Sequence, residues 1–287
     1  MNDATRASIM RLKASTHITL KSPERAALTA ILRPQSGAGQ WIVSEKYDVR
    51  PLVSPTEYVD VFGNLCQRFV MPKGKLDLDV ECVVECPDTI ATAPDAPYTP
   101  PEELPHEVLH YLVPSRYCPS DQTANAAREI AGQARPGYAR AEAIRAWIAD
   151  NIEYKRGTSD ESTSGLDTFN QRAGVCRDFA HVGIMLCRSL LIPARMVVGY
   201  LHKLAPPMDQ HAWFEAFVGG RWYTFDATQK EPRGGRIVIA YGRDAADVAI
   251  TTPFGPIEVD GMKVSVERLD APDAGQSGRL AHSAPGD

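Results

Sequence analysis

Residues 174–200 read GVCRDFAHVGIMLCRSLLIPARMVVGY and carry the pattern from which we infer the fold. After Cys176, apolar residues recur at intervals of three and four, which is typical of a helix that packs one stripe against other elements. The run ARMVVGY, residues 194–200, then has the composition of a buried strand. We therefore predict a helix that begins at Cys176 and is followed by a strand, with this packed stripe: Phe179, Ala180, Gly183, Cys187, Leu190 and Leu191.

Cys176 would occupy the first turn of this helix. Unpaired backbone N–H groups and the positive end of the helix dipole stabilise a thiolate there, and the same groups can hold an oxyanion. Cys187 lies eleven residues further on, on the same stripe and about three turns deeper, so we assign it to the core. Because a cysteine at a helix start can also be a packing residue, a partner base has to decide its role.

A partner base occurs in DQHAWFEAFVGGRWYTFDATQ, residues 209–229. This pattern indicates two alternating strands joined by a two-residue glycine turn. With that turn Val218 faces Arg221, and counting outward makes His211 and Asp226 diagonal neighbours on one face of the sheet. Diagonal Cβ atoms are about 7 Å apart or less, which lets a carboxylate reach an imidazole nitrogen. The alternative is a solvated cross-strand pair with no catalytic role.

The remaining sequence divides the chain into five parts. Short alternating segments between Gly, Pro and Ser clusters predict an all-β N-terminal domain at residues 15–86, and six prolines predict a linker at residues 87–105. Helix-like and then strand-like runs predict a catalytic domain at residues 106–268. We expect a flexible start at residues 1–14 and a disordered tail at residues 269–287. The expected fold class is α+β, with the cysteine-bearing helix packed on an antiparallel sheet.

Composition restricts the classes of function. The chain has 31 Lys+Arg against 36 Asp+Glu, a net charge of −5, and no basic block, which disfavours a nucleic-acid partner. No apolar run reaches the length needed to cross a bilayer, and the first residues lack the apolar stretch of a signal peptide, so we expect a cytoplasmic protein without a membrane partner. Six cysteines without a C-x-x-C pair are then expected to be reduced thiols.

Four segments occur in one order along the chain: AGVCRDFAHV at residues 173–182, IPARMVVGYL at 192–201, HAWFEAFV at 211–218 and WYTFDAT at 222–228. Together they resemble the core of the transglutaminase-like superfamily, in its bacterial cysteine-protease branch. The order Cys, His, Asp matches that family as well. The preceding β region, with DVFGN at residues 60–64, resembles the family's bacterial N-terminal domain. The resemblance therefore covers nearly the whole chain.

This resemblance implies a papain-like fold, in which a cysteine-bearing helix packs on a sheet that carries the histidine and the acid. It implies that Cys176 attacks an amide carbonyl to form a thioester, that His211 transfers the proton and that Asp226 orients His211. Release to water gives hydrolysis, and release to an amine gives transamidation. We expect hydrolysis of a peptide or another amide-bearing partner. No cofactor is implied, and no D-x-D-x-D-G stretch indicates a calcium loop.

Three further residues follow from the resemblance. Family members commonly use the cysteine's own N–H group and an upstream side chain as oxyanion donors, and Tyr154 and Gln171 are the two candidates for that side chain. Asp178 lies within the matched cysteine segment, where a structural charge at a helix start is expected. Loops such as residues 155–172 and 201–210 are expected to shape the substrate pocket.

Two other functions stay open at this point. His106-Glu107-x-x-His110 fits the H-E-x-x-H pattern of zinc metallopeptidases, and Glu129 is available as a third ligand. Against this, Pro105 and Pro114 leave room for barely two helical turns, beside a proline-rich linker. The other alternative is a binding module, in which the β domain recruits a peptide and the cysteine, histidine and acid are inert.

Overall fold

The computed structural model describes residues 8–37, 39–204 and 209–269 of the chain. Most of the expected flexible start and disordered tail, residues 1–7 and 270–287, lies outside the described residues. The expected start extended too far, because residues 9–14 already belong to a paired strand. Of the helices in the described part of the chain, none has the length and apolar character needed to cross a bilayer.

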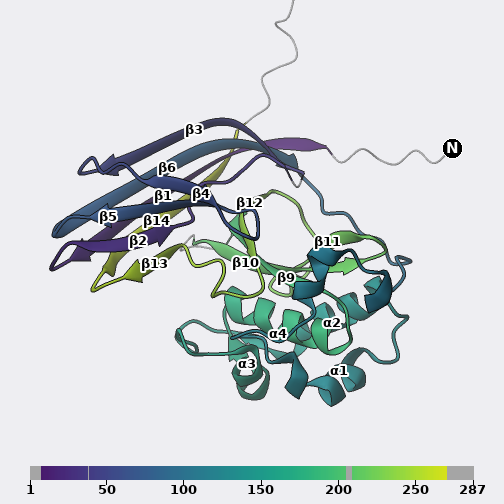
Figure 1. Cartoon of the computed structure of the whole chain (residues 1–287). Coiled ribbons are helices and arrows are strands. Elements are labelled where there is room, and N and C mark those ends of the chain that lie inside the picture. Colours follow the sequence, from purple (N-terminus) through teal and green to yellow (C-terminus); the bar gives the residue numbers. More distant parts are fainter. Residues whose placement is uncertain (1–7, 38, 205–208, 270–287) are drawn as a thin grey trace, which may run out of the picture.

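Two antiparallel four-stranded sheets pack face to face and form what we call the β module (Figure 1). The strand order of the first sheet is β14-β1-β6-β3, and that of the second is β13-β2-β5-β4. The strands of the first sheet are β1 (Ile9–Ser22), β3 (Trp41–Arg50), β6 (Gly74–Pro87) and β14 (Glu258–Leu269). Those of the second are β2 (Ala26–Ala30), β4 (Thr56–Val59), β5 (Leu65–Met71) and β13 (Thr251–Phe254).

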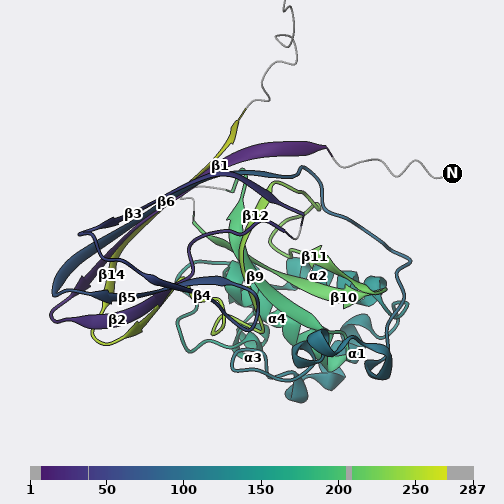
Figure 2. The same cartoon turned by 45° about the horizontal axis from the view of Figure 1, so that its top comes forward.

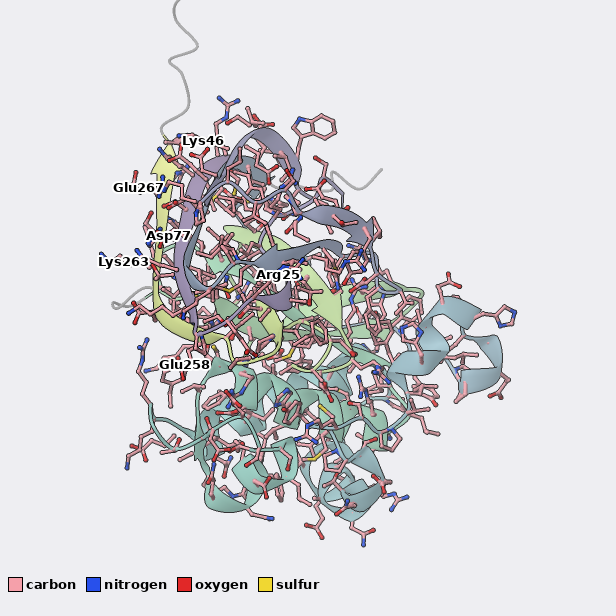
Figure 3. The ribbon with its side chains drawn as sticks, turned by 60° about the vertical axis from the view of Figure 1, so that its left-hand side comes forward. Arg25, Lys46, Asp77, Glu258, Lys263 and Glu267 are labelled. Atoms are coloured by element: carbon pink, nitrogen blue, oxygen red, sulfur yellow. The ribbon has the colours of Figure 1, made fainter. Side chains whose placement is uncertain are left out.

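The last two strands of the β module come from the C-terminal end of the chain. β14 pairs with β1, and β13 pairs with β2. Residues 106–268 were predicted to form one catalytic domain, but residues 251–269 belong to the β module. Without these strands, β1 and β2 would be sheet edges with unpaired backbone N–H and C=O groups, which is the physical reason for this placement. Charged side chains such as Asp77, Lys263 and Glu267 lie along the strands of the first sheet (Figure 3).

The catalytic domain is built on a third antiparallel sheet with helices on one side, so the predicted α+β class is confirmed (Figure 1). The strand order of its sheet is β11-β10-β9-β12. The strands are β9 (Ala194–Leu201), β10 (His211–Val218), β11 (Arg221–Phe225) and β12 (Arg236–Gly242), with a parallel pair of β7 (Glu153–Tyr154) and β8 (Ala173–Gly174). The helices are α1 (Ala124–Ala131), α2 (Tyr138–Asn151), α3 (Gly165–Gln171) and α4 (Cys176–Ser189), with short 3-10 helices η1 (Pro101–Glu103), η2 (His106–Tyr111) and η3 (Ser120–Gln122).

One apolar core spans the contact between the β module and the catalytic domain, and a second core lies between the two sheets of the β module. Alternate residues of β1 face inward, and they change from one core to the other near Thr16. Leu12, before Thr16, packs in the core shared with the catalytic domain. Ile18, after Thr16, packs between the two sheets of the β module. At the change-over, the hydroxyl groups of Thr16 and Tyr200 are hydrogen-bonded at 2.6 Å. Figure 2 shows β1 and β6 continuing from the β module over β12. This shared core holds the catalytic sheet in a fixed position.

Helix α4 is buried on nearly all sides, where the sequence predicted a single packed stripe. Val182, Met185 and Leu186, outside that stripe, are fully buried. The reason is that β9 and β10 cover one side of α4 while α1, α2 and α3 cover the other (Figure 1). At the end of the stripe, Leu191 is 51% exposed, because the helix ends at Ser189. The first residue of α4, Cys176, is thus presented by the most enclosed helix of the domain.

Gly183 sets the distance between α4 and β10. A Cβ atom at this position would overlap three ring carbons of Phe214 on β10. Helix propensity alone predicts that Gly183→Ala stabilises the fold by about 1 kcal/mol, but overpacking of a tight core typically costs about 1–3 kcal/mol. We expect a net loss of stability, measured as a lower midpoint of urea unfolding. Phe214→Leu should reduce that loss in the double variant; a more stable Gly183→Ala protein would contradict the close packing.

Candidate active site

The start of α4 is held by the buried carboxylate of Asp178. Its Oδ2 accepts the backbone N–H of Val175 at 2.9 Å and the hydroxyl of Ser159, and its Oδ1 accepts the Nε–H of Arg177 at 3.0 Å. Asp178 is completely buried and points back to the residue before the helix, away from the cleft described below. The carboxylate therefore fixes where the helix begins and which way its first N–H groups point.

Cys176 is the first residue of α4 and lies at the wall of a cleft of about 520 Å³. Its exposure is intermediate, whereas the other five cysteines of the chain are buried. Burial raises the pKa of Cys187, on the same helix, well above its ordinary value. Of the thiols, Cys176 is the one that combines access to solvent with a helix start.

The hairpin beside the cleft has the predicted register. Val218 pairs with Arg221, and the pairing continues outward to Phe214 and Phe225. Both turn glycines have positive φ angles, 56° and 80°, which is the conformation that a two-residue turn of this kind requires. His211 is the first residue of β10, and Asp226, the next one after β11, lies beside it.

Asp226 and His211 form a buried hydrogen-bonded pair. Nε2 of His211 lies 2.7 Å from Oδ2 of Asp226, and the two residues are 1% and 5% exposed. The same Oδ2 accepts Nη2–H of Arg236 at 2.8 Å, while Oδ1 accepts the hydroxyl of Thr228 at 2.6 Å. Burial alone would raise the pKa of Asp226, but the charges of Arg236 and His211 outweigh it and hold that pKa well below its ordinary value. Asp226 is therefore ionised.

The second ring nitrogen of His211 is not used by Asp226, and the side chain of Cys176 interacts with the ring. Nδ1 is buried and makes no hydrogen bond of ordinary length with a described residue, and both side chains line the same cleft. Burial lowers the pKa of His211, but the charge and hydrogen bond of Asp226 and the hydrogen bond of Cys176 together raise it to about 9. At neutral pH the imidazole is therefore protonated beside the sulfur, and it can give a proton to a group that leaves from a thiol adduct.

The two candidate oxyanion donors differ in position. Tyr154 lines the cleft and hydrogen-bonds with both the backbone and the side chain of Cys176; burial, followed by the charge of Cys176, raises its pKa. Gln171 ends α3 and does not line the cleft. Its amide donates to the backbone oxygens of Ala173 at 2.9 Å and Thr158 at 3.3 Å, which turns it toward the neighbouring loop.

A sequence model described as the transglutaminase-like superfamily matches residues 124–227, and one described as the bacterial transglutaminase-like N-terminal region matches residues 21–86. The "Uncharacterized protein ML0607" of Mycobacterium leprae is 31% identical over 281 residues, which is 91% of this chain and 99% of that protein. The chain belongs to the transglutaminase-like superfamily. "Uncharacterized protein Rv2569c" of Mycobacterium tuberculosis is 29% identical over 56% of this chain and 51% of that protein.

A solved structure extends this transglutaminase-like assignment to the whole fold. A crystal structure from Cytophaga hutchinsonii, described as "a Putative Cysteine Protease", is 35% identical and superposes with a TM-score of 0.86. The match covers 93% of each chain, so it includes the β module as well as the catalytic domain. The predicted family and its papain-like catalytic domain with an N-terminal β domain are thus confirmed. These comparisons support, in broad terms, a cysteine-dependent enzyme.

The zinc pattern does not form a zinc site in this transglutaminase-like chain. Its two histidines lie in η2, a 3-10 helix, where three residues per turn do not align positions four apart on one face. His106 is exposed, and the ring of His110 packs 3.9 Å from that of Tyr111. Glu129 is exposed on α1. Within the residues that the structure describes, no three His, Cys, Asp or Glu side chains gather as a metal-binding group.

Two residues at the site were not found from the sequence. Arg236 begins β12, and its guanidinium both pairs with Asp226 and lies 4.8 Å from the ring centre of Trp213. Thr228 follows β11 and donates its hydroxyl to the same carboxylate. An arginine at the start of a strand is common, so the position of Arg236 carried no signal. For Thr228 the one indication was its place in the matched segment, two residues after Asp226.

Proposed function

We propose that this protein is an acyl-transfer enzyme that cleaves amide or isopeptide bonds with Cys176 as nucleophile, His211 as proton carrier and Asp226 as the group that orients His211. The observation that carries the proposal is the buried Asp226–His211 pair at 2.7 Å, whose free ring nitrogen is left for the thiol at the start of α4. Nucleophile, base and orienting acid are the three parts that covalent acyl chemistry needs. We also propose, from the sequence, that it acts in the cytoplasm.

The reaction proceeds in two halves. His211 carries the proton of the Cys176 thiol, and the sulfur attacks the amide carbonyl carbon. A C–S bond forms, and the carbonyl oxygen becomes an oxyanion that accepts the N–H of Cys176 and the hydroxyl of Tyr154. The C–N bond then breaks as His211 gives its proton to the leaving nitrogen. In the second half a water molecule loses a proton to His211 and attacks the thioester. The C–S bond breaks as His211 returns that proton to the sulfur, and the acid and the free thiol are released.

The charges at the cleft favour water over an amine as the second substrate. Lys203 and Arg233 both line the cleft beside Cys176. Two fixed positive charges repel an ammonium group that approaches as an acyl acceptor, whereas neutral water is unaffected. We therefore propose hydrolysis as the main reaction and transamidation as the minor one.

Trapping of the acyl-enzyme tests this function. The full chain is incubated with a peptide-amide library, quenched in acid and digested, and the peptide that carries Cys176 is searched for an acyl mass. We expect a thioester on Cys176, lost in Cys176→Ala. Repeating the reaction in water labelled with heavy oxygen, with and without a primary amine, should give mainly labelled carboxylic acid. Binding of peptides without any acyl mass or product would indicate a binding module instead.

Tyr154→Phe tests the oxyanion donor. The variant keeps the ring that packs 5.8 Å from Phe179 but loses the hydroxyl beside Cys176. Removal of one oxyanion donor typically lowers kcat by about 10²–10³-fold, and we expect a fall of that order with little change in KM. Gln171→Leu is the matched control and should keep kcat within about threefold, since its amide is used outside the cleft. An equal loss in the two variants would remove Tyr154 from this role.

A further inference from the structure

The charged residues of the cleft are mostly cations. Arg156, Lys203 and Arg233 line it together with a single carboxylate, Asp209, although the chain as a whole carries a net charge of −5. The other acid nearby, Asp226, is already paired with His211 and Arg236. The excess of positive charge is therefore local to the cleft and is not a property of the surface as a whole.

The guanidinium of Arg233 is only weakly bonded within the chain. Its Nε has no hydrogen-bond partner among the described residues, and its Nη2 reaches the backbone oxygen of Lys203 at a long 3.4 Å. Gln210 also lines the cleft, but its side chain hydrogen-bonds with Tyr200. Buried donors are normally satisfied, because an unpaired one costs free energy. The Arg233 guanidinium can therefore still donate to an acceptor oxygen from outside the chain.

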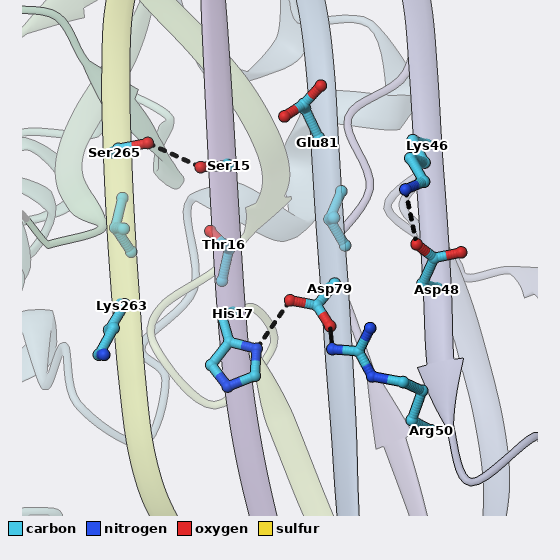
Figure 4. A pocket seen from close by; sticks show the side chains of 12 residues that line it. Ser15, Thr16, His17, Lys46, Asp48, Arg50, Asp79, Glu81, Lys263 and Ser265 are labelled. Atoms are coloured by element: carbon cyan, nitrogen blue, oxygen red, sulfur yellow. Dashed lines mark hydrogen bonds and ion pairs between the residues drawn. The ribbon is translucent and has the colours of Figure 1, made fainter.

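A second cavity of the molecule also has charged walls, and most of its charged side chains form ion pairs with one another. It has about 400 Å³ and lies on the outer face of the sheet β14-β1-β6-β3 (Figure 4). There Asp79 accepts from His17 at 2.7 Å and also pairs with Arg50, and Lys46 pairs with Asp48 at 3.1 Å. Arg50 and Lys46 thus have carboxylate partners within the chain, whereas Lys263 of the same cavity forms no ion pair with a described residue. In the cleft beside Cys176, neither Lys203 nor Arg233 forms an ion pair with a described residue.

We infer that the cleft recognises acyl donors that carry a carboxylate close to the scissile amide, held by Arg233 and Lys203. A guanidinium edge and a carboxylate match in geometry, and charge-assisted hydrogen bonds of this kind are the strong ones. Burial and the charge of the neighbouring Arg236 lower the pKa of Arg233. A bound carboxylate would offset both effects, because it stabilises the charged guanidinium. This inference rests on the proposed function, because it names the substrate class of the same site.

Alkylation of Cys176 by two matched reagents tests the inference without a known substrate. Iodoacetate carries a carboxylate and iodoacetamide is its neutral counterpart, so the ratio of their rates reports the anion preference of the cleft. We expect Arg233→Gln and Lys203→Gln each to lower this ratio by about threefold to tenfold, and added salt to lower it in the wild type. Arg25→Gln and Lys46→Gln remove exposed cations of the β module, labelled in Figure 3, and should leave the ratio unchanged.

The outcomes separate this inference from the proposed function. If iodoacetamide labels Cys176 no faster than an ordinary thiol and His211→Ala does not change the rate, the proposed function itself fails. If Cys176 is reactive but the ratio is unchanged in both cleft variants, the carboxylate inference is overturned and the proposed function stands. Lys203 is exposed, so Lys203→Gln gives a valid result even if Arg233→Gln folds poorly.

Matched peptide amides identify where the carboxylate comes from. One pair differs only by Glu or Gln beside the scissile amide, and the other only by a free or an amidated C-terminus. A preference for the acidic member of the first pair assigns a side-chain carboxylate, and a preference for the free end in the second assigns a terminal one. In either case the preference should fall in Arg233→Gln or Lys203→Gln. Equal turnover of both members in both pairs would contradict the inference.

Discussion

Cys176→Ala is expected to lower the turnover of the acyl donor identified by trapping by about 10⁴-fold or more, the order seen when a nucleophile is removed from a catalytic unit that acts together. The reason is that Cys176 is the one cysteine among the described residues that line the cleft, so no other thiol is placed to form the thioester. The measurement is kcat/KM at neutral pH, together with the unfolding midpoint. We expect the midpoint to change little, because Cys176 is only half-buried.

Cys187→Ala is the matched control for this prediction. It removes a thiol from the same helix, but from a fully buried position that faces the core. A small cavity should lower stability by about 1–2 kcal/mol and leave kcat within a few-fold of the wild type. His110→Ala and a chelator should also leave activity unchanged. Activity that survives in Cys176→Ala but disappears with the chelator would transfer the function to a metal site.

The parts of the site that could be predicted from the sequence are those set by local patterns. The periodicity after Cys176 indicated the helix, and the glycine turn allowed residues to be counted outward from Val218 and Arg221. Because strand pairing is strictly periodic, this count brought His211 next to Asp226 without any knowledge of the fold. The prediction of that pair needed only a turn of known length. The structure has this register, and Nε2 of His211 lies 2.7 Å from Oδ2 of Asp226.

The parts that could not be predicted depend on strand order and on packing. Arg236 reaches Asp226 because β12 lies beside β9 in the sheet. The residues around Arg236 do not indicate which strand pairs with β12. The place of β13 and β14 in the β module could not be predicted for the same reason. Alternating residues indicate a strand, but they do not indicate the sheet to which it belongs. For His106 and His110 the residue pattern fitted an α-helix, but the segment after Pro105 forms a tighter 3-10 helix.

Asp226→Asn is expected to lower kcat by about 10²–10⁴-fold, the range that general acid–base catalysis contributes. In the wild type Asp226 is what holds the pKa of His211 at about 9 against the opposing effect of burial. Activity that depends on the imidazolium should therefore persist through neutral pH and fall as the pH rises through about 9. Without the carboxylate, the largest effect that raises the pKa of His211 is lost while burial still lowers it, so the falling limb moves to lower pH. The measurement is the pH profile of kcat/KM.

Glu215→Gln separates this electrostatic effect from a general disturbance of the sheet. Glu215 is a buried carboxylate on the same strand as His211, and it pairs with Arg195 at 2.7 Å just as Asp226 pairs with Arg236 at 2.8 Å. Both variants remove one carboxylate from a buried ion pair with arginine, so both should lose stability. Only Asp226→Asn should move the pH limb, because Glu215 makes no contact with His211 and does not line the cleft. A shifted limb in both variants, or in neither, would mean that Asp226 does not set the charge of His211.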